Sequence, residues 1–189
     1  MHAENYSEEH YQRLWAAVLA GEVRQPGSFS NAAMNILSSI SPEEAGIFQQ
    51  LCNMSFNNGS RSIILLAVPD WHRPSININV KGSSTTMCEQ LVDYGIDPFH
   101  LLSMRTVGLL AGLPEEEYPE WDILLSEGVD YAGRLVTLQP KVKEGRIHVI
   151  SFTEAGHQLR GLIDKISHKT YTPALREIFK EASVVVKFL

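Results

Sequence analysis

In the first 56 residues, hydrophobic positions recur every three or four residues, which is the spacing of one buried helical face. Ser7 is placed to cap the first helix, and Gly21 lies where we expect this helix to end. Ser30 and Ser41 are placed to cap two more helices. Three short helices joined by tight turns predict a helical bundle over residues 1–56.

In the rest of the chain the pattern changes to short β-prone segments, which predict two hairpins. Residues 63–68 form an apolar run, and residues 75–80 alternate apolar and polar side chains. Residues 134–138 and 146–152 flank a charged turn, and the β-prone residues 184–189 are expected to dock on the body. Helices and hairpins in this order favour an α+β fold.

The C-terminal half resembles the back half of a winged-helix domain. The phrase Phe152-Thr153-Glu154-Ala155-Gly156 is similar to the point where such domains leave the wing and enter the closing helix. Thr153 would cap this helix, and Gly156 would allow a close approach between helix and strand. We therefore expect a helical bundle, residues 1–56, packed on a winged-helix-like module with two hairpins, residues 57–189, as one compact unit.

Four phrases spread along the chain carry a second resemblance. They are Leu14-Trp15-Ala16 with Leu19-Ala20-Gly21-Glu22, Pro26-Gly27-Ser28-Phe29-Ser30, Ser41-Pro42-Glu43-Glu44-Ala45 and Phe152-Thr153-Glu154-Ala155-Gly156. In this order they resemble an uncharacterised bacterial family of unknown function. The N-terminal phrase is also similar to proteins associated with abortive phage infection. The resemblance implies a bacterial, cytosolic setting, and the family has no established catalytic residues to carry over.

Charge and composition narrow the classes of function. The net charge is −6 and the pI is near 5.6, so binding to nucleic acid would need a local basic patch. The first residues have no signal-peptide pattern, and the longest aliphatic run, residues 63–68, is too short to cross a bilayer. Cys52 and Cys88 have no metal or redox spacing, which favours buried free thiols in a cytoplasmic protein over a disulfide.

Basic residues on the second hairpin are candidates for contacting DNA, as in the wing of a winged-helix protein. The presumed recognition helix begins at Asp97-Pro98 and is mostly apolar, and the acidic residues 115–117 come soon after it. The alternative is that the charged tip is simply solvated and limits association of strand edges. The candidate nucleic-acid contacts are Arg105 on that helix and Arg134, Lys141, Lys143 and Arg146 on or beside the hairpin.

A polar, aromatic loop between the strands of the first hairpin is a candidate partner-binding loop, because loops on rigid scaffolds often carry binding sites. The alternative is a tryptophan turn that packs over the bundle. The loop consists of Asp70, Trp71, His72 and Arg73.

No sequence pattern identifies a reaction centre. His148 and His157 flank the end of the second hairpin without metal-ligand spacing, and residues 81–86 lack the spacing of a phosphate-binding loop. We expect no catalytic residues, no metal and no cofactor.

The sequence therefore favours a non-enzymatic bacterial regulatory or protein-interaction module, in phage defence or a stress response, that binds a protein partner. The alternative is a winged-helix DNA-binding regulator that uses the second hairpin and Arg105. A third class, an enzyme, would need a pocket that gathers Asp70, His72 and Arg73.

Overall fold

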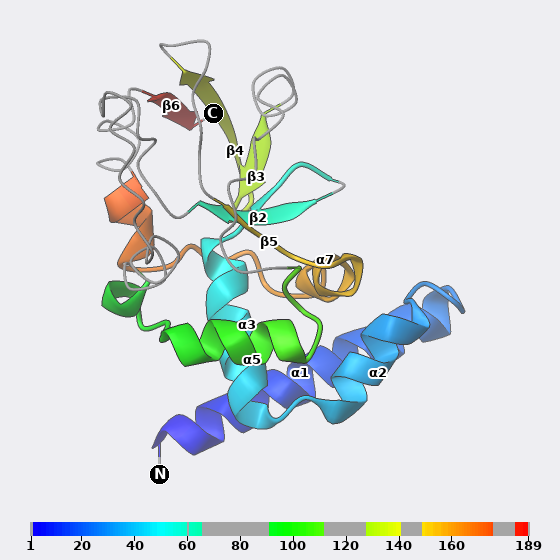
Figure 1. The fold of residues 1–189 in the computed structure, drawn as a ribbon. Coiled ribbons are helices and arrows are strands. Elements are labelled where there is room, and N and C mark those ends of the chain that lie inside the picture. The colour runs from blue at the N-terminus through cyan, green and yellow to red at the C-terminus, as the bar shows by residue number, and fades with distance from the viewer. Residues whose placement is uncertain are drawn as a thin grey trace, which may run out of the picture.

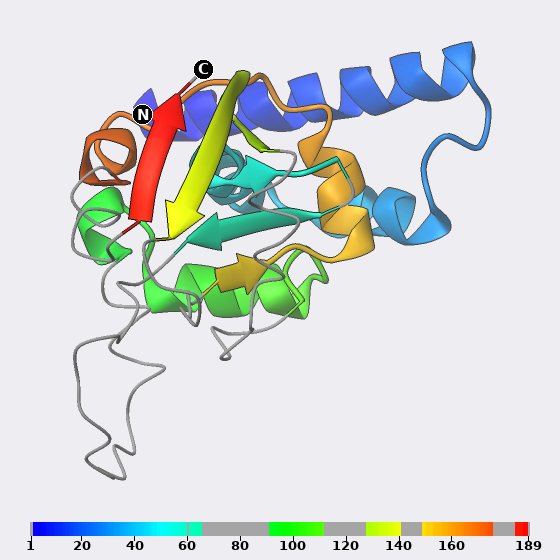
Figure 2. The same ribbon diagram turned by 90° about the horizontal axis from the view of Figure 1, so that it is seen from above.

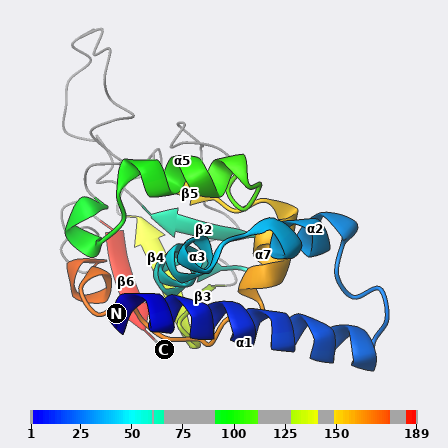
Figure 3. The same ribbon diagram turned by 90° about the horizontal axis from the view of Figure 1, so that it is seen from below.

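The computed structural model describes residues 2–59, 61–65, 91–111, 128–140, 149–175 and 184–188. Helices and an antiparallel sheet make up this part of the chain (Figure 1), so the fold is α+β, as the sequence predicts. The helical elements are α1 (His2–Arg24), α2 (Asn31–Ser39), α3 (Pro42–Met54), η1 (Val92–Tyr94), α5 (Pro98–Thr106) and α7 (Glu154–Arg160). The helices gather on one side of the sheet, with α3 between α1 and α5 (Figure 3).

The helix starts expected from sequence are largely confirmed by their hydrogen bonds. The Ser30 hydroxyl accepts from Ala33 N and begins α2. The capping box at the start of α3 is complete: Ser41 Oγ accepts from Glu44 N, and the Glu44 carboxylate accepts from Ser41 N. Asp97 is the N-cap of α5: its backbone is extended, and its carboxylate accepts a hydrogen bond from Phe99 N. These local signals need no tertiary contact, which is why the sequence alone reveals them.

The first helix differs from the prediction at both ends. It begins before Ser7 and continues past Gly21 to Arg24. A Cβ atom at Gly21 would lie 2.7 Å from Cε2 of Phe29, so this glycine allows α1 to pack against the turn before α2. A glycine that ends a helix and a glycine that permits close packing look the same in a sequence.

The described strands form one six-stranded antiparallel sheet in the order β5-β2-β1-β3-β4-β6. Figure 2 shows β4 and β6 side by side at one end of the sheet and β5 at the other. The strands are β1 (Phe56–Asn57), β2 (Ser62–Leu65), β3 (Val129–Tyr131), β4 (Arg134–Pro140), β5 (Val149–Ser151) and β6 (Val184–Phe188). The C-terminal strand docks on the body as expected, because β6 pairs with β4.

The second predicted hairpin is wrong. Strand β4 has β3 on one side and β6 on the other, whereas β5 pairs with β2 at the far end of the sheet. The turn that enters β4 is a tight one that the sequence analysis missed, at Ala132 (φ 51°) and Gly133 (φ 81°). Positive φ at both central residues gives the turn whose twist suits a two-residue hairpin. Alternation along a strand marks the strand but says nothing about its partner.

The first predicted hairpin is partly outside the described residues. Its strand over residues 75–80 is among those that the structure does not describe. Strand β2 itself pairs with β1 and β5.

A close backbone crossing joins α5 to α7. Gly156 lies so near the end of the α5 segment that a Cβ atom would stand 2.2 Å from the carbonyl oxygen of Leu109. Thr153 supports the crossing, since its hydroxyl donates to Gly108 O at 2.6 Å and accepts from Gly156 N. The predicted cap is confirmed, and Gly156 does allow a close approach, but the segment that it approaches is the one that follows α5 and not a strand.

Buried residues from the helices and the sheet form one core cluster that extends along the chain from Leu14 to Leu175. Aromatic pairs connect its parts: Phe56 and Tyr131 stack across neighbouring strands at 4.7 Å, and Phe48 of α3 meets Phe152 beside the sheet at 6.0 Å.

Replacement of Gly156 by alanine tests this crossing. The new methyl group would overlap a backbone oxygen that cannot move without displacing Thr153, so we expect a loss of about 3 kcal/mol or more in unfolding free energy. Gly161→Ala is the matched control, because Gly161 has helical dihedrals and its nearest contact would be at 3.2 Å. We expect that control to stay within about 1 kcal/mol of wild type in urea unfolding. Equal effects of the two substitutions would contradict the constraint.

Candidate functional site

A depression in the described part of the chain lies beside the β3–β4 turn. Its volume is about 310 Å³, and the segment around residues 165–172 forms its other wall. The lining residues are Tyr131, Ala132, Arg134, Lys165, Ile166, Ser167 and Thr172. We call this the turn pocket.

The turn pocket is lined by cationic groups and by hydroxyl groups. Lys165 forms an ion pair with Asp130, and Gly133 N also donates to the Asp130 carboxylate. Burial alone would raise the pKa of Asp130, but these donors together hold it below its usual value. The carboxylate therefore stays ionised and fixes the position of Lys165. Arg134 is exposed at the rim and has no ion-pair partner among the described residues.

The hydroxyl groups of the turn pocket lie at its inner side. The phenol of Tyr131 and the hydroxyl of Thr172 are 2.7 Å apart and hydrogen-bonded. Burial raises the pKa of Tyr131, so the phenol is neutral and can donate a hydrogen bond.

A narrower cleft adjoins the turn pocket and shares Ala132, Lys165 and Ile166 with it. Arg160, the last residue of α7, lines this cleft and is only 6% exposed. Its guanidinium donates to the hydroxyl of Ser55 at 2.9 Å and to the carbonyl of Ser55 at 3.3 Å, at the end of α3. Both acceptors are neutral, although the negative end of the α3 dipole favours the positive charge.

Cys52 lies in the same cleft and is a buried free thiol, as the sequence predicts. Burial raises the pKa of this thiol well above its usual range, more than the nearby charge of Arg160 lowers it. The thiol is therefore protonated and poorly reactive. Cys88 is outside the described residues.

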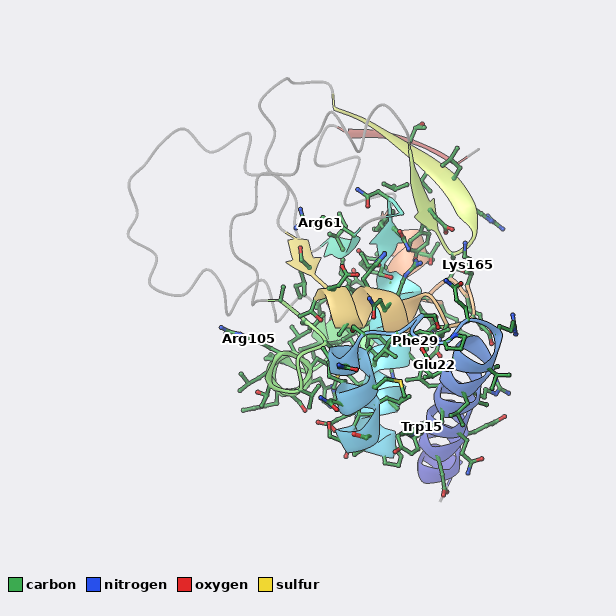
Figure 4. All side chains as sticks on the ribbon, turned by 90° about the vertical axis from the view of Figure 1, so that its right-hand side faces the viewer. Trp15, Glu22, Phe29, Arg61, Arg105 and Lys165 are labelled. Carbon is green, nitrogen blue, oxygen red and sulfur yellow. The ribbon has the colours of Figure 1, made fainter. Side chains whose placement is uncertain are left out.

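The predicted nucleic-acid contacts do not form one surface in the described part of the chain. Arg134 lines the turn pocket with Lys165, whereas Arg105 lies on α5, and Figure 4 shows Arg105 and Lys165 on opposite sides of the molecule. Lys141, Lys143 and Arg146 are outside the described residues.

The predicted partner-binding loop, Asp70, Trp71, His72 and Arg73, is likewise outside the described residues. The enzyme alternative that depends on three of these side chains therefore stays a prediction.

Two polar groups that could suggest catalysis have structural contacts instead. Ser62 Oγ and His157 Nδ1 are 2.9 Å apart, but Ser62 is only 1% exposed within β2. A nucleophile must reach its substrate, so this pair is a hydrogen bond between sheet and helix with a structural role.

Among the described residues no group of three or more His, Cys, Asp or Glu side chains could hold a metal ion. None of the described helices is long and apolar enough to span a bilayer.

The phrases of the N-terminal resemblance also have structural roles. The carboxylate of Glu22 accepts hydrogen bonds from Gly27 N at 2.8 Å, Phe29 N at 2.9 Å and the hydroxyl of Ser28 at 3.1 Å. These donors lower the pKa of Glu22, and Figure 4 shows Glu22 directly below Phe29. The glutamate therefore holds the turn between α1 and α2 in shape.

Sequence reasoning missed most of the turn pocket. Tyr131, Lys165 and Thr172 are far apart in sequence, and none of them belongs to a motif. A sequence signal was available only at Ala132-Gly133, as a turn between two β-prone runs, but alanine rarely occupies such a turn.

These observations define a mixed α+β protein with a small polar pocket. The phrases quoted from its sequence hold turns and helix ends in place. A family model described as a protein of unknown function, DUF2806, matches residues 1–176, and the chain therefore belongs to this family. Neither the curated proteins nor the solved structures include a match to the chain.

His168 connects the wall of the turn pocket to the helices. Its backbone N–H donates to the Asn53 carbonyl at 3.2 Å, and its ring nitrogen Nδ1 accepts from Tyr171 N at 3.2 Å. The ring also packs edge-to-face with Tyr94 and Tyr171. Burial lowers the pKa of His168, more than a hydrogen bond to the backbone of Tyr94 raises it.

We predict that this histidine makes the protein less stable in mild acid. The unfolded chain takes up the proton near pH 6.5, whereas the folded chain resists protonation, so unfolding free energy falls as the pH drops below about 6.5. In urea unfolding between pH 5.5 and 7.5, His168→Gln should show a weaker pH dependence than wild type. Parallel pH curves for the two proteins would contradict this assignment.

Proposed function

We propose that this chain is a non-enzymatic module that binds a protein partner through the outer face of α5. The observation that carries the proposal is the exposure of apolar side chains there: Phe99 is 78% exposed and Leu102 is 48% exposed. The opposite side of α5 carries the buried Leu101 and Met104. Large apolar side chains grouped on one surface are typical of contact sites for proteins.

The partner that suits this face has an apolar surface with an acidic group beside it. Arg105 is exposed and lies about one turn after Leu102 on α5. Aromatic residues and arginine are enriched at protein interfaces. A carboxylate of the partner would complement this arginine at the edge of the contact.

The alternative, a winged-helix DNA-binding regulator, receives less support from the same helix. Arg105 is the one Lys or Arg residue in α5, and His100 accepts a hydrogen bond from Asp97 N in the capping box. A recognition helix normally offers several polar side chains to base edges and phosphates. The entry into α7 through the Thr153 cap still supports a winged-helix-like C-terminal half.

The non-enzymatic part of the proposal is supported by the roles of the signature residues. In those phrases, Glu22 and Thr153 hold backbone segments in place through hydrogen bonds, and Gly156 allows two segments to cross closely. The bacterial and cytoplasmic setting and a role in phage defence or a stress response rest on the sequence resemblance.

Binding to a protein partner can be tested by retention from nuclease-treated bacterial lysate, followed by reconstitution of the complex from purified components. We expect a protein that wild type retains in stoichiometric amounts and that a Phe99→Ser, Leu102→Ser double variant loses by about tenfold or more. Val23→Ser is the matched control, because Val23 is 84% exposed on α1 and its substitution should leave binding unchanged.

Three results would contradict the proposal. The control variant could lose binding equally, nuclease treatment could abolish retention, or the purified chain could turn over a substrate. Nuclease-sensitive retention would favour the DNA-binding alternative.

A further inference from the structure

The turn pocket has the composition of a site for an anion. Arg134 and Lys165 bring two positive charges to one depression in a chain whose net charge is −6. Lys165 has three donor hydrogens and uses one of them on Asp130, which leaves others for a ligand. Tyr131 and Thr172 are hydrogen-bonded to each other, so one hydroxyl hydrogen of this pair remains for a ligand.

The buried guanidinium of Arg160 increases the positive charge behind the pocket. A buried charge is costly unless it is compensated, and its hydrogen-bond acceptors at Ser55 are neutral. The nearby Asp130 is already engaged by Lys165 and by Gly133 N. Asp130 also interacts electrostatically with Arg160, and Asp164 lines the adjoining cleft, so two carboxylates stand against the three cations Arg134, Lys165 and Arg160. An anion in the turn pocket would compensate the remaining positive charge.

We propose that the turn pocket binds a small phosphorylated molecule, with Arg134 and Lys165 contacting the phosphate group. A phosphate group accepts several hydrogen bonds at once, and it suits the combination of a planar arginine, a lysine point charge and hydroxyl donors. The volume of about 310 Å³ is at the lower end of the range for small-molecule sites. Ala132 and Ile166 offer an apolar wall to the carbon part of the ligand.

This site is independent of the proposed protein contact on α5. Figure 4 places Lys165 and Arg105 on opposite sides of the molecule, so substitutions at one surface leave the other intact. Either proposal can therefore fail without the other.

The test is calorimetric titration of the full chain with pyrophosphate, inorganic phosphate and acetate at constant ionic strength. We expect saturable binding of pyrophosphate or phosphate with one site per chain, and markedly weaker binding of acetate. Arg134→Gln and Lys165→Gln should each weaken binding by about tenfold or more. Both side chains are exposed, so the variants should fold, which circular dichroism can verify.

Two further variants make the test specific. Arg13→Gln removes an exposed positive charge on α1 that is also ion-paired, with Glu9, and it should leave the affinity unchanged. Tyr131→Phe keeps the buried ring and removes one donor, so it should weaken binding by a smaller factor than loss of either cation.

Absence of saturable binding by either phosphate compound would overturn the proposal. An equal loss in Arg13→Gln would also overturn it, because the interaction would then be a general charge effect. A single-stranded oligonucleotide is the third arm: if it binds in an Arg134- and Lys165-dependent way while pyrophosphate does not, the ligand is a polynucleotide and the small-molecule proposal is wrong.

Discussion

The contact between Gly156 and the carbonyl oxygen of Leu109 is the constraint on which the arrangement of helices and sheet depends. At this point the chain leaving α5 crosses the start of α7 at a distance that no side chain beyond hydrogen allows. Hydrogen bonds on both sides hold the crossing: Thr153 N donates to Leu109 O, and Ala111 N donates to Ser151 O at the end of β5. The crossing therefore fixes α5, α7 and the edge of the sheet relative to one another.

Two of the phrases quoted from the sequence lie next to this crossing. Glu22 shapes the turn before α2, and at the end of that turn Ser30 N donates to the side-chain oxygen of Gln158 in α7 at 3.0 Å. The hydroxyl of Ser103 in α5 donates to the Glu44 carboxylate in α3, and this hydrogen bond connects α3 to α5. Residues of the quoted phrases thus hold turns and helices in place.

The described part of the chain offers two candidate surfaces for function, and they differ in chemistry. The outer face of α5 is apolar with one arginine, whereas the turn pocket is cationic with hydroxyl groups. The first suits a protein partner, and the second suits a small anion. The segment that contains His168 forms one wall of the pocket. The His168 ring packs on Tyr171 and on Tyr94, which lies in η1 before α5.

The sequence by itself determined the features that depend on neighbours within a few residues. Ser30, Ser41 and Thr153 cap their helices as predicted, since the groups that each cap satisfies lie within three positions of it. The tertiary structure alone decided that β5 pairs with β2, that Gly21 lies inside a helix, and that Lys165 and Arg134 line the same pocket. Those outcomes depend on which distant segments compete for the same strand edge or packing surface, and the local pattern of a segment carries no record of that competition.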